Sequence, residues 1–79
     1  MLPLKRQLRV RETFYASGVP VRAGQIVMAT SISEDVNPDE RMYRLLICLQ
    51  PLDPPGDTIL WDRTQPLGAD YVRKLFEEV

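Results

Sequence analysis

The chain has 79 residues, with ten basic and eleven acidic side chains and a net charge of −1. This length suits one small domain, which would bury only about 60% of its unfolded surface and be marginally stable alone. One cysteine and no histidine exclude an intrachain disulfide and a zinc site of cysteine and histidine ligands. We therefore expect a partner protein, or a second copy of the chain in a homo-oligomer, to supply additional stability.

The charges are distributed unevenly along the chain. Residues 1–22 carry five basic and one acidic side chain, whereas residues 23–79 carry five basic and ten acidic ones. Such asymmetry is typical of a docking surface, of a nucleic-acid-binding arm, or of two solvated faces of one domain. No run is long and apolar enough for a membrane span, and residues 1–10 lack the apolar core of a secretory signal. With the single thiol, this predicts a cytoplasmic protein without membrane contact.

The segment after a lead-in over residues 1–7 predicts a half-buried strand. Residues 8–15 alternate between apolar and polar side chains, with Leu8, Val10 and Phe14 on one face. Glu12 interrupts this apolar face and warns of a change of register.

Two turns separate this strand from the next main strand. Residues 16–18 predict a turn, and residues 19–21 predict a short extended piece at an edge or at a strand start, because Pro20 cannot donate a ladder hydrogen bond. Residues 25–32 then predict a second main strand. Its alternation places on one side Ile26, Met28 and Ile32, and on the other Val27 and Ala29.

Residues 41–52 contain the densest apolar run, and two interpretations of it stay open. In a strand, one face carries Tyr43, Leu45, Ile47 and Leu49. In a helix over residues 38–49, one stripe carries Met42, Leu45, Leu46 and Leu49.

The flanking segments favour different answers. The polar residues 33–41 suggest an exposed loop, but Asn37 and Glu40 have the spacing of a capping box and Pro38 suits a first helical turn. A loop rich in proline and glycine after the run, followed by the apolar residues 58–62, favours a hairpin. We prefer the strand.

The last segment, residues 69–79, predicts a helix after a loop over residues 62–67. Apolar side chains at positions 71, 72, 75, 76 and 79 form one stripe, and Asp70 lies in the first turn. A helix of this length is not stable alone and has to dock. The whole chain therefore predicts one α+β domain over residues 1–79. Its β-rich body spans residues 8–62 and holds a small antiparallel sheet of four to five strands, either open or curled into an SH3-like barrel, with one C-terminal helix.

Catalysis has little support in this sequence. Without histidine the commonest general base is missing, and Cys48 lies in an apolar run, where a buried thiol is inert. The paired acids lie in loop-like segments, where we expect them to be solvated, whereas acid–base catalysis requires burial. We expect no enzyme, no cofactor and no metal site.

A protein-binding module is the function that these observations favour, acting as an adaptor, an inhibitor or an assembly subunit. Its small size and missing catalytic set suit an accessory protein of a phage or mobile element. The expected contact residues are the aromatic and basic side chains Trp61, Tyr15, Tyr43, Arg9, Arg11 and Arg63. Trp61 suits either a core lid or a contact residue. The segment Pro51-Leu52-Asp53-Pro54 resembles a polyproline ligand, and an edge strand of a small sheet can take a peptide by strand addition.

Single-stranded nucleic-acid binding is the alternative. Arg9 and Arg11 share the polar face of the predicted first strand with Tyr15, and such a face can follow a phosphate backbone and stack a base. The acidic pI near 5.3 argues against it.

Overall fold

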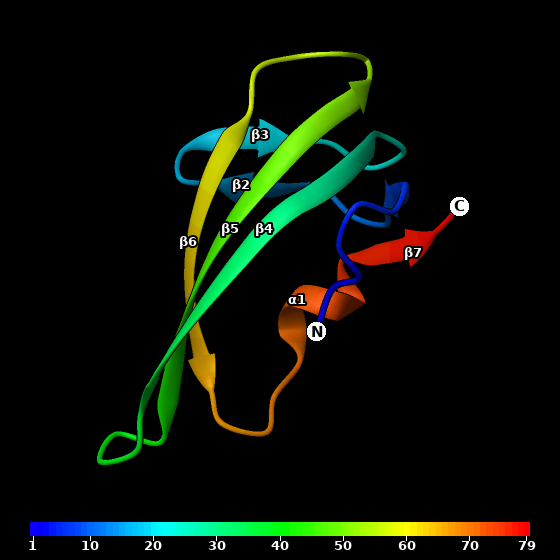
Figure 1. Cartoon of the computed structure of the whole chain (residues 1–79). Coiled ribbons are helices and arrows are strands. Elements are labelled where there is room, and N and C mark those ends of the chain that lie inside the picture. The colour runs from blue at the N-terminus through cyan, green and yellow to red at the C-terminus, as the bar shows by residue number, and fades with distance from the viewer.

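The protein is built on an antiparallel sheet of five strands in the order β6-β5-β4-β1-β7, with β2 and β3 in a separate two-stranded sheet (Figure 1). The computed structural model describes all 79 residues. The elements in chain order are β1 (Leu8–Val10), β2 (Phe14–Ala16), β3 (Val19–Val21), β4 (Ile26–Asn37), β5 (Met42–Asp53), β6 (Ile59–Pro66), α1 (Tyr71–Lys74) and β7 (Phe76–Glu78).

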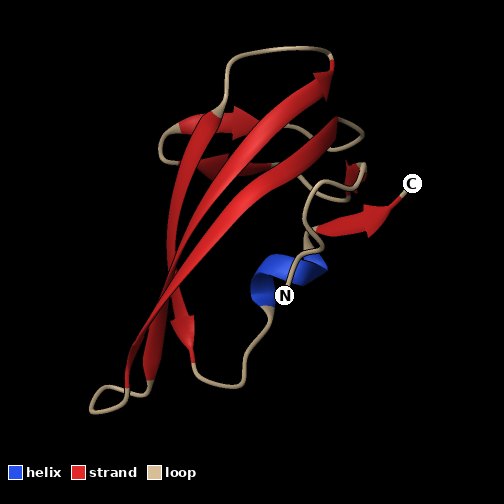
Figure 2. Ribbon diagram, in the orientation of Figure 1, coloured by secondary structure: helices blue, strands red, loops and turns tan.

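The fold is mostly β, so the α+β prediction holds only loosely. Its one helix has four residues, and strands make up nearly all other regular structure (Figure 2). The five-stranded sheet is open, with β6 and β7 as its two edges, so the predicted closure into a barrel is wrong. No helix is long and apolar enough to cross a membrane.

The apolar run forms the central strand β5, which confirms the strand interpretation and excludes the helix. Leu45, Ile47 and Leu49 are at most 1% exposed and form the middle of the core. The capping-box residues belong to the hairpin turn, where the Asn37 side chain accepts a hydrogen bond of 3.3 Å from the Glu40 amide. The same side-chain hydrogen bond forms in a turn and at the start of a helix, so the capping-box spacing did not distinguish the two structures.

β4 and β5 continue past the core as a projecting hairpin, which we call the arm (residues 33–42). The sequence predicted a loop over residues 33–41, but β4 runs to Asn37 and pairs with β5 up to Met42. Polar side chains suit both faces of this ladder because nearly all of the arm is exposed. The arm makes the molecule elongated, with extents of 40 × 21 × 20 Å (Figure 1).

A β-bulge in β4 explains why its predicted faces were only partly right. The pairing with β5 shifts by one residue between Ala29 and Ser31, so Thr30 is the extra residue. Val27 and Ala29 are buried, and the shift then turns Ile32, rather than Thr30 or Ser31, toward the core. Simple alternation placed Ile32 on the opposite side.

The predicted strand over residues 8–15 is two strands in different sheets. β1 ends at Val10 and β2 begins at Phe14, with Glu12 in the exposed connection. Leu8 and Val10 are buried and Phe14 packs against the same core, so the predicted apolar face is correct although the strand is interrupted.

The predicted C-terminal helix is the largest error. Only residues 71–74 are helical, and Phe76–Glu78 pair with β1 as edge strand β7. This arrangement buries Phe76 completely, and it places Glu77 beside Arg9 of β1 with 3.2 Å between the paired nitrogen and oxygen. In a helix Glu77 would lie at the negative end of the dipole, whereas the strand gives it a cationic neighbour.

Candidate functional site

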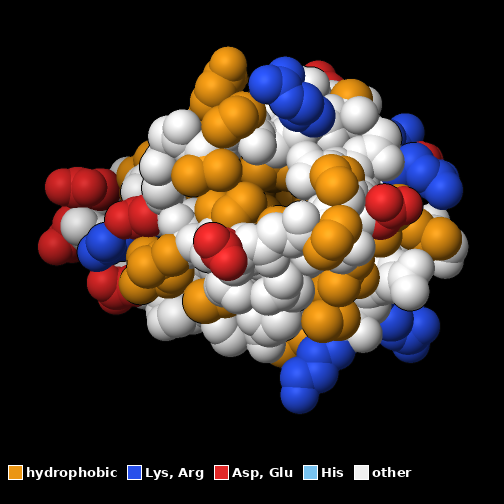
Figure 3. Space-filling model, turned by 90° about the horizontal axis from the view of Figure 1, so that it is seen from above, with side chains coloured by type: hydrophobic (Ala, Val, Ile, Leu, Met, Phe, Trp, Pro, Cys, Tyr) orange, Lys and Arg blue, Asp and Glu red, His pale blue; other side chains and the backbone are white.

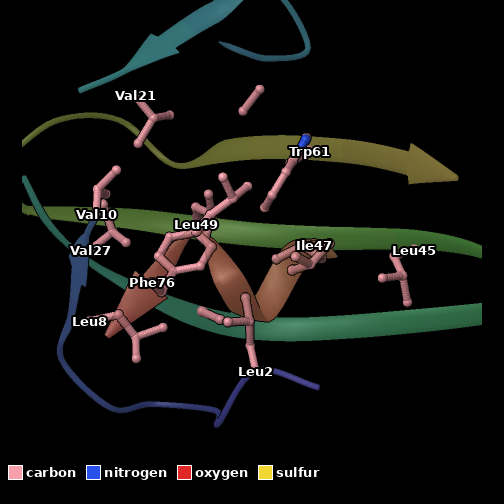
Figure 4. Close-up of a cluster of buried hydrophobic side chains, with 14 residues drawn as sticks. Leu2, Leu8, Val10, Val21, Val27, Leu45, Ile47, Leu49, Trp61 and Phe76 are labelled. Carbon is pink, nitrogen blue, oxygen red and sulfur yellow. The ribbon is translucent and has the colours of Figure 1, made fainter. Parts of the chain in front are cut away.

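Trp61 is a core residue. Its side chain is 2% exposed and lies in the core with Phe76 (Figure 4). Together with Phe14 these residues form an aromatic cluster whose ring centroids are 4.6 to 6.2 Å apart. The strand hairpin β5–β6 was predicted, but β6 extends to Pro66 rather than ending at residue 62. Of the two interpretations of Trp61, the structure supports the core lid, and the indole has almost no surface for a partner.

Arg63 and Tyr43 also have structural roles. The Arg63 guanidinium carbon lies 5.9 Å from the centroid of the Trp61 ring, within cation–π range. The Tyr43 hydroxyl donates to the Ala69 carbonyl oxygen over 3.1 Å and accepts from the amide of buried Gln65. Tyr43 therefore ties the base of the arm to the loop before α1.

Arg9, Arg11 and Tyr15 do not share one strand face. Arg9 lies on β1 and is paired with Glu77, Arg11 follows the end of that strand, and Tyr15 lies on β2 of the other sheet. Tyr15 is 69% exposed and Arg11 is exposed. The single basic strand face that motivated nucleic-acid binding is therefore not found.

A groove of about 520 Å³ with a mixed apolar and polar lining lies at the end of the molecule opposite the arm tip (Figure 3). A concavity of about 550 Å³ adjoins it at Pro20, Gln25 and Pro54. The groove lies between the β2–β3 hairpin and the loop that joins β5 to β6. Its lining, which we call the groove, consists of Ala16, Ser17, Val19, Pro20, Gln25, Pro51, Pro54, Pro55, Gly56, Asp57, Thr58, Ile59 and Leu60. Hydrophobic side chains gather around the hollow in the space-filling view.

One wall of the groove is held by side-chain hydrogen bonds. The amide nitrogen of Gln50 donates to the Gly56 carbonyl oxygen over 2.8 Å, and the Thr58 hydroxyl donates to the amide oxygen of Gln50 over 2.7 Å. An isolated bridge also joins Leu52 to Pro55. This wall is preordered, which lowers the entropic cost of binding a ligand. It also means that Pro51–Pro54 is not a free polyproline ligand, because Pro51 is buried at the end of β5.

The opposite wall is the tight β2–β3 hairpin. Ser17 and Gly18 both have positive φ, 51° and 84°, as a two-residue hairpin turn requires. Val19 is 44% exposed on the groove side, and Pro20 has no amide to offer at the outer edge of β3.

The outer edge of β6 borders the groove. The Asp62 amide points away from β5 and donates to the Ser17 hydroxyl oxygen over 3.4 Å. Since backbone direction alternates along an antiparallel strand, the amide and carbonyl of Leu60 face the same outer side. No strand pairs with that side of β6, and the Leu60 side chain is 58% exposed.

Two charged features lie close to this edge. Asp57 lines the groove and makes no ion pair. Asp62 is held by Arg44 of β5 through two hydrogen bonds of 3.0 and 2.6 Å. These bonds lower the pKa of the Asp62 carboxyl and raise the pKa of the Arg44 guanidinium. Asp57 is therefore the acid that remains available to a ligand.

The side chains that line the groove define the chemistry it can offer a ligand. It offers apolar contacts, prolines, two hydroxyls and one carboxylate, without a nucleophile held against a base. No group of three His, Cys, Asp or Glu side chains is placed to bind a metal ion.

Sequence reasoning missed most of the groove residues. The proline-rich loop was recognised as exposed and rigid, but Val19, Ile59 and Leu60 appeared only as strand residues. Their exposure depends on how β2 and β3 lie beside β6, which no local pattern specifies. The one available signal was Pro20, which predicted either a sheet edge or a strand start at this place.

Comparison with protein-family models, with curated proteins and with solved structures found no match. The function has to be inferred from the chemistry of the groove.

Proposed function

We propose that the protein is a small non-enzymatic protein-binding module, an adaptor or assembly subunit that holds a short segment of a partner in the groove. The observation that carries this proposal is the pair of exposed apolar side chains in the groove, Val19 and Leu60, with 44% and 58% of their surface exposed. Large apolar side chains gathered in one concavity are typical of interaction sites.

The groove differs from the contact surface that the sequence suggested. Trp61 packs on the core side of β6 in its aromatic cluster. The preceding residue, Leu60, is exposed on the opposite face of the strand. The free thiol of Cys48, half-buried in β5, suits a reducing compartment, and we propose a cytoplasmic setting.

A random dodecapeptide library displayed on phage, selected on the immobilised protein, tests the proposal. Enriched peptides should bind the wild type and lose at least tenfold in affinity with Leu60→Glu or Val19→Asp, because each change places a charge among apolar contacts. Isothermal titration of the synthetic peptides measures the affinities.

The matched control is Val36→Asp, since Val36 is 54% exposed on the arm, far along the chain from the groove. It should leave peptide affinity unchanged. Equal loss with the arm variant, or no enriched peptide at all, would contradict a peptide-binding groove.

A further inference from the structure

We infer that the groove takes its ligand by strand addition: an extended apolar segment carrying one lysine or arginine pairs with the outer edge of β6 at Leu60. This inference rests on the proposed function and specifies how the same groove recognises its partner.

The backbone geometry provides the first argument. The Asp62 amide points outward to Ser17, so the amide and carbonyl of Leu60, two residues earlier, point outward as well. Asp62 is thus closed by the β2–β3 turn, whereas Leu60 opens into the groove. An extended peptide would find one donor and one acceptor there and would end at Ser17.

The size of the groove provides the second argument. A stable interface between two folded proteins buries at least about 1,200 Å² in total. A concavity of about 520 Å³ between one hairpin and one loop fits a few residues of extended chain instead. The groove therefore suits a linear segment better than a second copy of this domain.

Charge provides the third argument. The groove residues include one acid, Asp57, and no basic residue, and Asp57 makes no ion pair within the protein. A basic side chain of the peptide is the complement that this carboxylate lacks. The bound segment should alternate apolar residues at every second position and carry its lysine or arginine near Asp57.

The test uses the synthetic form of the tightest peptide selected from the library and compares two substitutions at one position. Leu60→Ala removes the side chain and keeps the amide, whereas Leu60→Pro removes both without breaking a bond to β5. The Leu60→Pro variant should bind the peptide about tenfold more weakly than the Leu60→Ala variant, a difference equivalent to one lost hydrogen bond. Thr64→Pro, on the same edge beyond Ser17, is the control for the fold and should bind as the wild type does.

Hydrogen exchange provides a readout that needs no variant. Saturating peptide should slow exchange of the Leu60 amide at least tenfold, and Asp57→Asn should weaken binding and reduce its dependence on salt. If Leu60→Pro and Leu60→Ala bind equally while Leu60→Glu does not bind, strand addition is wrong and the groove proposal stands. If none of these variants changes the affinity, both the strand-addition inference and the proposed binding function of the groove are wrong. Protection of the Leu60 amide that rises with protein concentration alone would also overturn the inference and identify a second copy as the occupant.

Discussion

Two neighbouring residues of β6 differ in burial, and we propose different roles for them. Trp61 is 2% exposed in the aromatic cluster, and Leu60 is 58% exposed on the other face. Trp61→Ala should lower the free energy of unfolding by about 3–5 kcal/mol, since it empties a large core position. Leu60→Ala should change it by less than about 0.5 kcal/mol. Urea denaturation followed by circular dichroism measures both, and equal losses would show that the two side chains are not separated in this way.

Gly18 is required by the backbone of the β2–β3 turn rather than by space. Its φ is 84°, yet a β-carbon there would meet no atom within 4 Å. Gly18→Ala should therefore cost about 1–2 kcal/mol through the left-handed conformation alone. Gly56→Ala is the matched control, because its β-carbon would meet Pro51 at an ordinary 3.6 Å and its φ is not in the left-handed region. Thermal melts should show a lower midpoint for the first variant only.

At the scale of elements, the pair between Arg44 of β5 and Asp62 of β6 predicts a pH dependence. The folded pKa of Asp62 lies below its ordinary value of about 3.9, so the pair stabilises the fold above that value. The contribution disappears as the pH falls through the folded pKa. Asp62→Asn should lower the melting midpoint by at most a few degrees at pH 7, because the pair is exposed, and this difference should shrink as the pH falls below about 3.9. Asp57→Asn, which removes an unpaired acid, should show no such difference; a gap between Asp62→Asn and the wild type that does not shrink on acidification would point to another cause.

The same scale shows what the sequence could predict. β5 was recognised because period-two alternation of Leu45, Ile47 and Leu49 is strong and local. The C-terminal segment failed because its apolar spacing suits a helix, while its actual partner, β1, lies 68 positions away at the Arg9–Glu77 contact. The strand pairing of the arm was not predicted because its polar residues show no alternation of apolar side chains.

Candidate contacts were harder to predict than strands. A single tryptophan near a strand end suits a core or a surface, and the decision depends on Phe14 and Phe76, which arrive from other elements. The groove likewise forms only when the β2–β3 hairpin reaches β6, at the bond between Ser17 and the Asp62 amide. Such juxtapositions are tertiary, and residue types alone do not encode them locally.

At the scale of the whole molecule, the protein has a packed body and a projecting arm with different expected stabilities. The buried residues of β4 end at Ala29, and residues 33–37 of this strand are exposed. These residues pair only with residues 42–46 of β5, which pair on their other side with β6, and the Leu67 amide holds the turn through the Arg41 carbonyl oxygen. An edge strand without a packed face opens readily, whereas opening the body exposes the core.

Native-state hydrogen exchange should resolve this difference. Paired amides of residues 33–37 should exchange at least a hundredfold faster than those of Ile47–Leu49, because local opening of the β4 edge breaks the former and only global unfolding exposes the latter. Leu67→Pro removes the amide that holds Arg41 and should speed exchange in the arm while leaving β5 of the body protected. Equal protection along both segments would mean that the arm unfolds only with the body, and that a further contact, such as a second copy of the chain, covers it.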